Sequence, residues 1–238
     1  MKEILFKDLG ESQDYQKTWD FQEELLAENI AIKTQNRVKE KNSQTDFEST
    51  KNHLLFVEHP HVYTLGKSGH IENLLANQDF LNQIKATFVK TNRGGDITYH
   101  GPGQLVGYPI LDLDNFKPDI HLYMRNLEEV IIRAISDYGL KGERSKGETG
   151  VWLDVGKPFA RKICAMGVKA SRWVTMHGFA LNVNTDLKYF EYIIPCGIKD
   201  KAVTSLEREL GNPIPIQDVK EKVKKYFEEV FEAEMINS

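Results

Sequence analysis

The chain has 238 residues, 40% of them hydrophobic, so it is large enough to bury the core of one domain. Its formal net charge of -4 excludes the strongly basic surface typical of nucleic-acid binders, and no stretch approaches the ~18 apolar residues of a membrane span. Only two cysteines occur, which excludes a disulfide framework, so we expect reduced thiols, a cytoplasmic protein, and neither nucleic acid nor a membrane as partner.

The first predicted element is an amphipathic helix with Ser12 as its N-cap. Its buried stripe at helical spacing consists of Tyr15, Trp19, Gln22, Leu25 and Leu26. Residues 33–52 (KTQNRVKEKNSQTDFESTKN) are polar and charged with almost no periodicity. This composition predicts a mobile loop after the helix.

The remaining elements are strands gathered around a middle helix. Apolar runs bounded by turn residues predict strands at 54–58, 62–65, 86–90, 105–113, 151–155, 162–168 and 178–183. Helical spacing predicts helices at 119–138 and 218–231. This order predicts an α+β fold with a mixed β-sheet core and flanking helices. Two domain arrangements stay open: one domain over residues 1–238, or that domain with a small C-terminal helical extension at 211–238.

The segment RGGDITYHGPGQLVGYPI (93–110) is rich in glycine and ends like a buried strand. It matches neither the GxGxxG dinucleotide fingerprint nor the GxxxxGK[ST] phosphate loop. Glycine backbone can approach a ligand closely, and an arginine such as Arg93 can donate to a carboxylate or phosphate. Because Asp96, Thr98 and His100 alternate along a stretch that would be extended, they would project to one side. The segment therefore favours a lined pocket over a tight structural turn.

The histidines do not have the spacing of a metal site. Structural zinc sites usually show pairs such as CxxC or HxxxH, which this sequence lacks, so we predict no metal. His59 and His61 flank Pro60 between two predicted strands. The simpler interpretation is that they cap a hairpin-like loop, although a catalytic role stays open.

The two cysteines have different settings. Strand alternation in RKICAMGVKA places Cys164 on the same face as Lys162, Met166 and Val168, where it is most simply a small core residue. Cys196 lies in IIPCGIKD, where Pro195 and Gly197 favour an irregular bend and lysines follow. An accessible thiol near ammonium groups would ionise more readily, so Cys196 is either a nucleophile or an inert loop cysteine.

Six motifs, taken together, resemble one enzyme family in order and spacing across about residues 54–206: EHPHVYTLGK, RGGDITYHGPGQLVGYPI, TGVW, KICAMGVK, HGFALNVN and PCGI. The family is that of the octanoyl-acyl carrier protein to protein octanoyltransferases, also called lipoyl transferase B. The resemblance implies the catalytic fold of biotin and lipoate protein ligases. It also implies transfer of an octanoyl group from octanoyl-acyl carrier protein to a lysine, carried by lipoyl domains of 2-oxoacid dehydrogenase E2 subunits or by the glycine-cleavage H protein.

The resemblance also assigns residues. It implies that Cys196 forms an acyl thioester and that Lys162 lowers the pKa of its thiol and moves protons. The acyl-substrate site would be lined by Arg93, Gly94, Gly95, Asp96, Ile97, Thr98, Tyr99, His100, Ala165, Met166, Gly167, Gly178, Phe179 and Ala180. No metal, nucleotide or other cofactor is implied, because the acyl group arrives already activated.

Three alternatives remain at this stage. The first is an ATP-dependent lipoate or octanoate ligase, and the second is a non-catalytic lipoyl-domain-binding protein of the same fold. The third is a cysteine hydrolase, which would be expected to use His100 or His177 as its base. The sequence fixes neither the acyl-chain length, nor the donors to the oxyanion, nor the role of His100, nor the oligomeric state.

Overall fold

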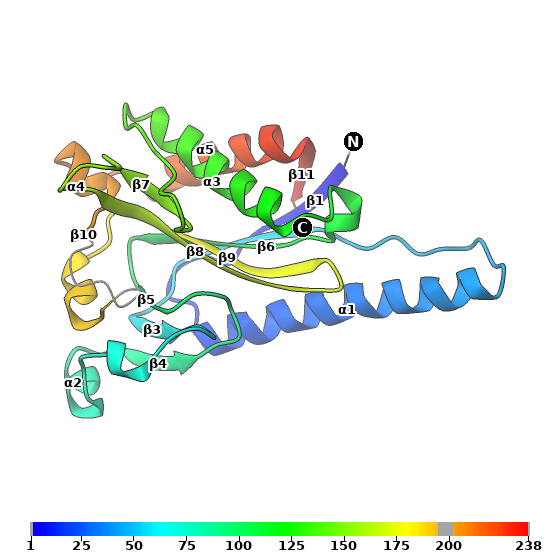
Figure 1. Cartoon of the computed structure of the whole chain (residues 1–238), viewed down its shortest axis with the longest axis horizontal. Coiled ribbons are helices and arrows are strands. Elements are labelled where there is room, and N and C mark those ends of the chain that lie inside the picture. Colours follow the sequence, from blue (N-terminus) through cyan, green and yellow to red (C-terminus); the bar gives the residue numbers. More distant parts are fainter. Residues whose placement is uncertain (1, 195–201, 238) are drawn as a thin grey trace.

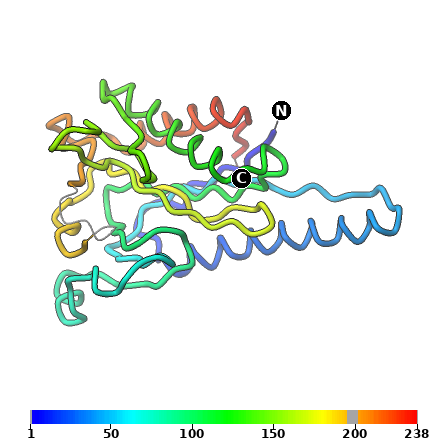
Figure 2. The backbone as a smooth tube through the Cα atoms, viewed as in Figure 1, coloured from blue at the N-terminus to red at the C-terminus, as the bar shows by residue number. Residues whose placement is uncertain are grey.

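The structure is a computed structural model that describes residues 2–194 and 202–237. A large twisted sheet forms the centre of the body, with helices α3 and α5 on one face (Figure 1). Helix α1 and a smaller sheet cover the other face, and the two ends of the chain lie near each other (Figures 1 and 2). This architecture confirms the predicted α+β fold with a mixed sheet.

The main sheet has eight strands among the described residues, seven of them in the order β10-β8-β9-β6-β2-β1-β11, with β7 paired to β8. Their bounds are β1 Lys2–Asp8, β2 His53–Val57, β6 Gln104–Ile110, β7 Val151–Leu153, β8 Arg161–Ser171, β9 Val174–Asn182, β10 Ala202–Val203 and β11 Ala233–Asn237. Strands β6 and β9 are buried at every position, because elements cover the sheet on both faces.

The smaller sheet has the order β4-β3-β5. Its strands are β3 Val62–Leu65, β4 Thr87–Lys90 and β5 Ile97–His100. Strands β2 and β3 therefore belong to different sheets, and the hairpin-like loop predicted around His59 and His61 is wrong. The segment between them carries the chain from one sheet to the other, and His59 is fully buried between the Gln13 carbonyl and the Tyr108 hydroxyl.

The helices are α1 Tyr15–Lys41, α2 Gln78–Gln83, α3 Ile120–Ser136, α4 Leu206–Leu210 and α5 Ile216–Phe231, with short 3₁₀ turns η1 Ile71–Asn73, η2 Leu113–Asn115 and η3 Leu187–Tyr192. The largest core cluster lies between the main sheet and helices α3 and α5. A second cluster joins α1 to the opposite face of the sheet. At the C-terminal end, α5 packs on α3, and β11 pairs in parallel with β1. None of the helices in the described part of the chain is long and apolar enough to cross a membrane.

Helix α1 departs from the prediction at both ends. Asp14, not Ser12, is the N-cap, because its side chain accepts from the backbone N–H of Lys17. The helix also continues to Lys41, so the predicted loop at 33–52 is wrong for its first half. This half projects from the body as an arm (Figure 1) and has no buried stripe to reveal it in the sequence. Lysine, glutamine, arginine and glutamate are good helix formers and sustain it in solvent.

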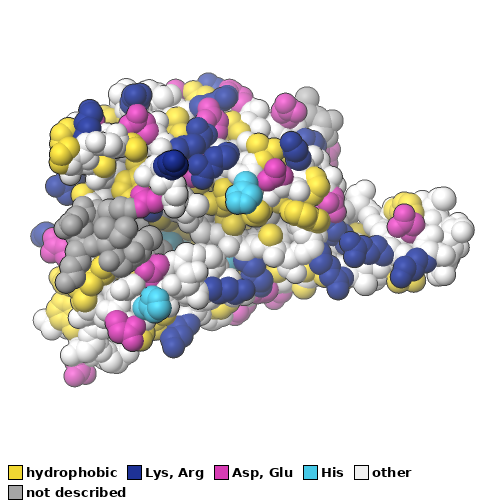
Figure 3. Space-filling view, viewed as in Figure 1, with side chains coloured by type: hydrophobic (Ala, Val, Ile, Leu, Met, Phe, Trp, Pro, Cys, Tyr) yellow, Lys and Arg dark blue, Asp and Glu magenta, His cyan; other side chains and the backbone are white. Residues whose placement is uncertain are grey.

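The chain returning from the arm is fastened to α1 by two asparagine side chains. The Asn29 amide exchanges two hydrogen bonds with the backbone of Lys51, both 2.8 Å long. Two helical turns further on, the Asn36 amide does the same with Glu48, at 2.7 and 3.0 Å. Each pair imitates the two hydrogen bonds of an antiparallel strand pair, which explains how a polar segment lies against an exposed helix. Basic and acidic side chains are interspersed over the face in Figure 3, the arm included.

Candidate functional site

A cavity of about 110 Å³ lies between the main sheet and the segment that carries RGGDITYH. Its lining includes Lys162, which was expected to be catalytic, and most of the residues expected to bind the acyl substrate: Arg93, Gly95, Asp96, Ile97, Thr98, His100, Ala165, Met166, Gly167, Gly178, Phe179 and Ala180. Gly94 and Tyr99 are not in the lining. The Gly94 N–H donates to the Val168 carbonyl at 2.9 Å, and the Tyr99 ring stacks on Tyr189 outside the cavity.

Sequence reasoning considered His177 only as the base of an alternative cysteine hydrolase, and it did not assign the remaining lining residues to the site: Tyr15, Gln104, Val106, Tyr108, Thr149, Asn182, Phe190 and Val203. Most come from elements that the patterns did predict, such as β6 and β9. Tyr15 lies far from the other lining residues in the sequence. It enters the cavity from the first turn of α1 and stacks on His100 with ring centroids 5.7 Å apart. Only tertiary packing brings that helix to the cavity, so the sequence held no local signal for it.

Arg93 is a buried cation in the wall of this cavity, with 7% of its surface exposed. Its guanidinium donates to the Thr64 carbonyl at 2.6 Å, to the Thr64 hydroxyl at 3.0 Å and to the Gly94 carbonyl at 3.0 Å. These bonds tie the glycine-rich segment to the end of β3. Close approach of the backbone requires glycine here, since a Cβ on Gly66 would lie 2.3 Å from the Gly95 oxygen.

His100 begins a chain of buried hydrogen bonds across the cavity. Its Nδ1 lies 2.8 Å from Gln104 Oε1, and the Gln104 amide donates to Asn182 Oδ1 at 2.9 Å. The Asn182 amide then donates to the Thr204 carbonyl at 2.9 Å. Since the Gln104 oxygen accepts in this chain, Nδ1 of His100 carries the proton. Burial, with repulsion from His59 and Arg93, holds the pKa of His100 well below its usual value, so the ring is neutral.

His177 is the second histidine in the lining, and its backbone is unusual. It adopts the left-handed region within β9, with φ of 57°, which non-glycine residues rarely occupy. Its Nε2 lies 2.7 Å from Asn92 Oδ1. Burial and the nearby Arg93 lower its pKa to about 3, so this ring is also neutral. Their low pKa values make both cavity histidines weak bases near neutral pH.

Lys162 reaches the cavity because β8 contains a bulge. Val151 of β7 pairs with Cys164, whereas the next residue, Trp152, pairs with Lys162, so Ile163 is the extra residue. The predicted alternation, with Lys162 and Cys164 on one face, is wrong for this reason. Cys164 packs in the core under α3, while Lys162 lines the cavity and places its Nζ 4.6 Å from the centroid of the Trp152 ring.

Of the two cysteines, the structure describes only Cys164, which is the small core residue that its sequence setting suggested. Cys164 is fully buried, and burial raises the pKa of its thiol far above the usual range, which leaves it protonated and inert. Cys196 lies outside the described residues. The chain before it is attached to η1, where the Ile194 N–H donates to the Asn73 carbonyl at 2.8 Å. The chain after it joins the main sheet, where Val203 pairs with Lys162.

Because buried histidines resist protonation, we expect the free energy of unfolding to fall markedly in mild acid. The pKa of His59 is lowered to about 4 and that of His177 to about 3, mainly by burial, so the unfolded chain binds more protons below pH 6.5. Stability therefore falls as pH falls through this window, by about 1.4 kcal/mol per pH unit for each histidine once the pH is below 6. Urea unfolding at pH 7, 6 and 5 measures the slope, and His59→Gln should reduce it by one histidine's share. A free energy of unfolding that does not change between pH 6.5 and 5 would contradict this account.

The fold first defines a class of protein. The structure superposes with a TM-score of 0.67 on a bi-partite lipoate protein ligase from Thermoplasma acidophilum, with 16% identity, covering 100% of this chain and 86% of that one. It superposes equally well, at 16% identity, on lipoate-protein ligase A bound with ATP, covering 100% of this chain and 88% of that one. At such identities the likeness shows the catalytic-domain fold of lipoate protein ligases.

Sequence comparison then narrows the class. Residues 14–228 match the lipoyl protein ligase A/B catalytic domain family. An octanoyltransferase of Christiangramia forsetii is 63% identical over 235 residues, 98% of each chain, and one of Flavobacterium psychrophilum is 61% identical over 236 residues, 99% of each chain. The chain belongs to the lipoyl protein ligase A/B catalytic domain family and, within it, to the octanoyltransferases.

Proposed function

We propose that this octanoyltransferase takes its acyl group from octanoyl-acyl carrier protein, holds it as a thioester on Cys196, and passes it to a lysine of a lipoyl domain. The acceptors would be lipoyl domains of 2-oxoacid dehydrogenase E2 subunits and the glycine-cleavage H protein. The observation that carries the proposal is the position of Lys162, whose side chain lines the cavity while its backbone pairs with the strand directly after the Cys196 segment. The activity is assigned to one catalytic domain over residues 1–238.

The first step is an exchange between two thioesters. The Cys196 thiolate attacks the carbonyl carbon, a new S–C bond forms, and the S–C bond to the phosphopantetheine thiol breaks. Little free energy is lost, because one sulfur leaving group replaces another, and the acyl group stays activated. In the second step the lysine amine attacks, a C–N bond forms, and Cys196 leaves as a thiol.

Lys162 would serve both steps. An ammonium group near Cys196 favours the thiolate, which is the nucleophilic form of cysteine. The same group can return a proton to the departing phosphopantetheine thiol and later help to remove one from the attacking amine. Burial makes His100 and His177 weak bases, which supports a lysine in this role over a cysteine–histidine pair.

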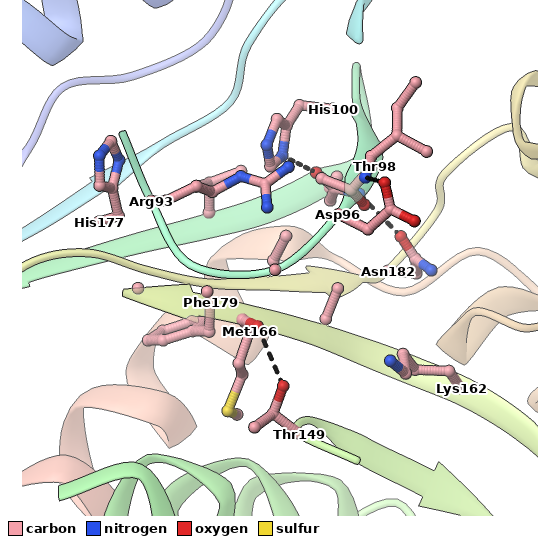
Figure 4. Close-up of a pocket in the computed structure, with 18 of the residues that line it drawn as sticks. Arg93, Asp96, Thr98, His100, Thr149, Lys162, Met166, His177, Phe179 and Asn182 are labelled. Atoms are coloured by element: carbon pink, nitrogen blue, oxygen red, sulfur yellow. Dashed lines mark hydrogen bonds between the residues drawn. The ribbon is translucent and has the colours of Figure 1, made fainter. Parts of the chain in front are cut away.

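The acyl chain would lie in the cavity between two walls. We assign one wall to the segment 93–100, of which Gly94 and Tyr99 lie outside the lining itself, and the opposite wall, or floor, to residues 165–167 and 178–180. Apolar and small side chains dominate the floor, which suits an alkyl chain that must leave water. In the close-up of Figure 4, Lys162, Asp96 and Asn182 lie toward one side of the cavity. We place the thioester at that side.

The proposal predicts transfer without nucleotide. When octanoyl-carrier protein and an unmodified lipoyl domain are mixed with the enzyme, octanoylated lipoyl domain should form at the same rate with and without ATP and magnesium, because the thioester is already activated. Intact-mass spectrometry of the lipoyl domain measures the product. Free octanoate with ATP serves as the matched substrate pair and should give no product. Product from free octanoate and ATP alone would instead show an ATP-dependent ligase.

A further inference from the structure

The cavity has a direction along strand β8. Lys162 and Val203 lie at one end, and Gly167 lies at the other, beside Arg93 and His177. Figure 4 shows the Lys162 and His177 side chains on opposite sides of the cavity. Four residues lie between Lys162 and Gly167 and one of them, Ile163, is the bulge, so the run is roughly 14 Å at the usual strand rise. This run leaves room for an extended eight-carbon acyl group on a thiol near Lys162.

Along this length the floor of the cavity is a groove, because several side chains there are small. Two cross-strand pairs, one on each side of the Met166–Phe179 pair, contribute only small residues: Ala165 opposite Ala180 and Gly167 opposite Gly178. All four lie in the cavity lining. The short side chains of Ala165 and Ala180 leave the space between the sheet and the glycine-rich segment open to an alkyl chain. At Gly167 and Gly178 the backbone is closely covered instead, since an added Cβ would meet the Gly94 or the Gly107 oxygen.

The groove is closed at Gly167. Here the glycine-rich segment crosses β8, and the Gly94 N–H donates to the Val168 carbonyl at 2.9 Å. A Cβ added to Gly167 would lie 2.7 Å from the Gly94 oxygen and 3.4 Å from the Cδ of Arg93. The backbone of the glycine-rich segment therefore lies directly against the backbone of β8. An acyl chain that follows the floor of the groove cannot continue along the strand beyond this point.

The closed end is also polar. Asn92 donates through its amide nitrogen to Glu23 at 2.7 Å, so its oxygen faces His177 as an acceptor. His177 must then carry its proton on Nε2, and its Nδ1 is an acceptor. This side chain is 1% exposed, and Nδ1 has no hydrogen-bond partner among the described residues. Such an acceptor can be satisfied by a small polar molecule such as water, but not by methylene groups.

We propose that His177, with the backbone crossing at Gly167, limits the acyl chain to about eight carbons. This inference rests on the proposed transfer and names its chain-length specificity. A longer chain would press methylene groups against the buried imidazole and the Arg93 guanidinium, and polar groups covered by hydrocarbon lose their stabilising partners. A shorter chain would leave the small-residue floor unfilled and would forgo apolar burial.

The test compares hexanoyl-, octanoyl- and decanoyl-carrier protein as donors, with the initial rate of acyl-enzyme formation followed by intact-mass spectrometry. His177→Leu should raise the decanoyl-to-octanoyl rate ratio by about tenfold, because the polar end becomes apolar. Ala165→Val narrows the floor near Lys162 and should instead raise the hexanoyl-to-octanoyl ratio by about tenfold. Ratios within one protein cancel any general loss of activity or of folded enzyme.

His59→Leu is the matched control, since His59 is also a buried neutral histidine but does not line the cavity. Its ratios should stay within about twofold of the wild type. The inference is overturned if neither His177→Leu nor Ala165→Val changes its ratio, or if His59→Leu shifts the decanoyl ratio as much as His177→Leu. Failure of the wild-type protein to form an acyl-enzyme with any donor would overturn the proposed transfer itself, and the chain-length limit with it.

Discussion

Cys196→Ala should abolish both the acyl-enzyme and octanoyl transfer, because no other thiol of the chain can form the thioester. The second cysteine, Cys164, is fully buried in the core, and the pKa of its thiol is raised far above the usual range. We expect the transfer rate to fall by at least about a thousandfold, as for other enzymes that lose a covalent nucleophile. The measurement is product formation on a lipoyl domain, with intact-mass detection of the enzyme in parallel.

Cys164→Ala is the control for this prediction. The substitution removes one buried sulfur and should cost about 1 kcal/mol of stability, since only a small side chain is lost from the core. Its transfer rate should stay near that of the wild type. A Cys164→Ala enzyme that forms no acyl-enzyme while remaining folded would reverse the assignment of the two cysteines.

Lys162→Met should be the second most damaging substitution. Methionine keeps much of the aliphatic length and the contact with Trp152, but it removes the ammonium group and the proton carrier. We expect acyl-enzyme formation to fall by roughly 10²–10⁴-fold at pH 7. The rate should recover partly as the pH rises toward the ordinary pKa of a thiol, about 8.5, because the thiolate then forms without help.

The pH profile separates a chemical role of Lys162 from a structural one. A structural defect would lower the rate equally at every pH, whereas loss of the ammonium group should move the rising limb of the profile to higher pH. Lys157→Met is the matched control, since Lys157 lies in the turn before β8, is exposed and pairs with Asp154. It should retain the wild-type profile. An unshifted profile for Lys162→Met would remove Lys162 from the mechanism.

The helices and strands that could be predicted from the sequence are those in which burial determines the spacing of the apolar residues. Strand β3 coincides with the predicted 62–65, and α3 differs from its prediction by one residue at its start and two at its end. Both are packed over a full face, so their apolar spacing reports their environment. Strands β1 and β11 had no comparable signal. They pair with each other at the edge of the sheet, and each has only two or fewer fully buried residues.

Two errors have physical causes that no local pattern contains. The second half of α1 is exposed and is fastened by Asn29 and Asn36 to a distant segment, so its sequence looks like a loop. The bulge at Ile163 turns Lys162 toward the cavity, whereas strict alternation would have buried it beside Cys164. A one-residue insertion in a strand reverses every face after it, and the sequence does not mark where it occurs.

Residues of the glycine-rich segment line the cavity, but the partners that hold the segment in place could be identified only from the fold. Arg93 and His100 line the cavity with hydrogen bonds to Thr64 and Gln104, and neither is free to act as a base. Tyr15 of α1 and His177 and Asn182 of β9 complete the cavity lining from two distant parts of the chain. Their contribution depends on tertiary contacts that a single sequence does not show.

Locating the trapped acyl group tests the central claim most directly. The enzyme is mixed with octanoyl-carrier protein in the absence of a lipoyl domain, quenched in acid to preserve thioesters, digested, and mapped by tandem mass spectrometry. We predict an octanoyl group on the peptide that contains Cys196, removable by neutral hydroxylamine, and none on the peptide that contains Cys164. An octanoyl group on Cys164, or full transfer activity in an enzyme that never carries an octanoyl group, would contradict the account.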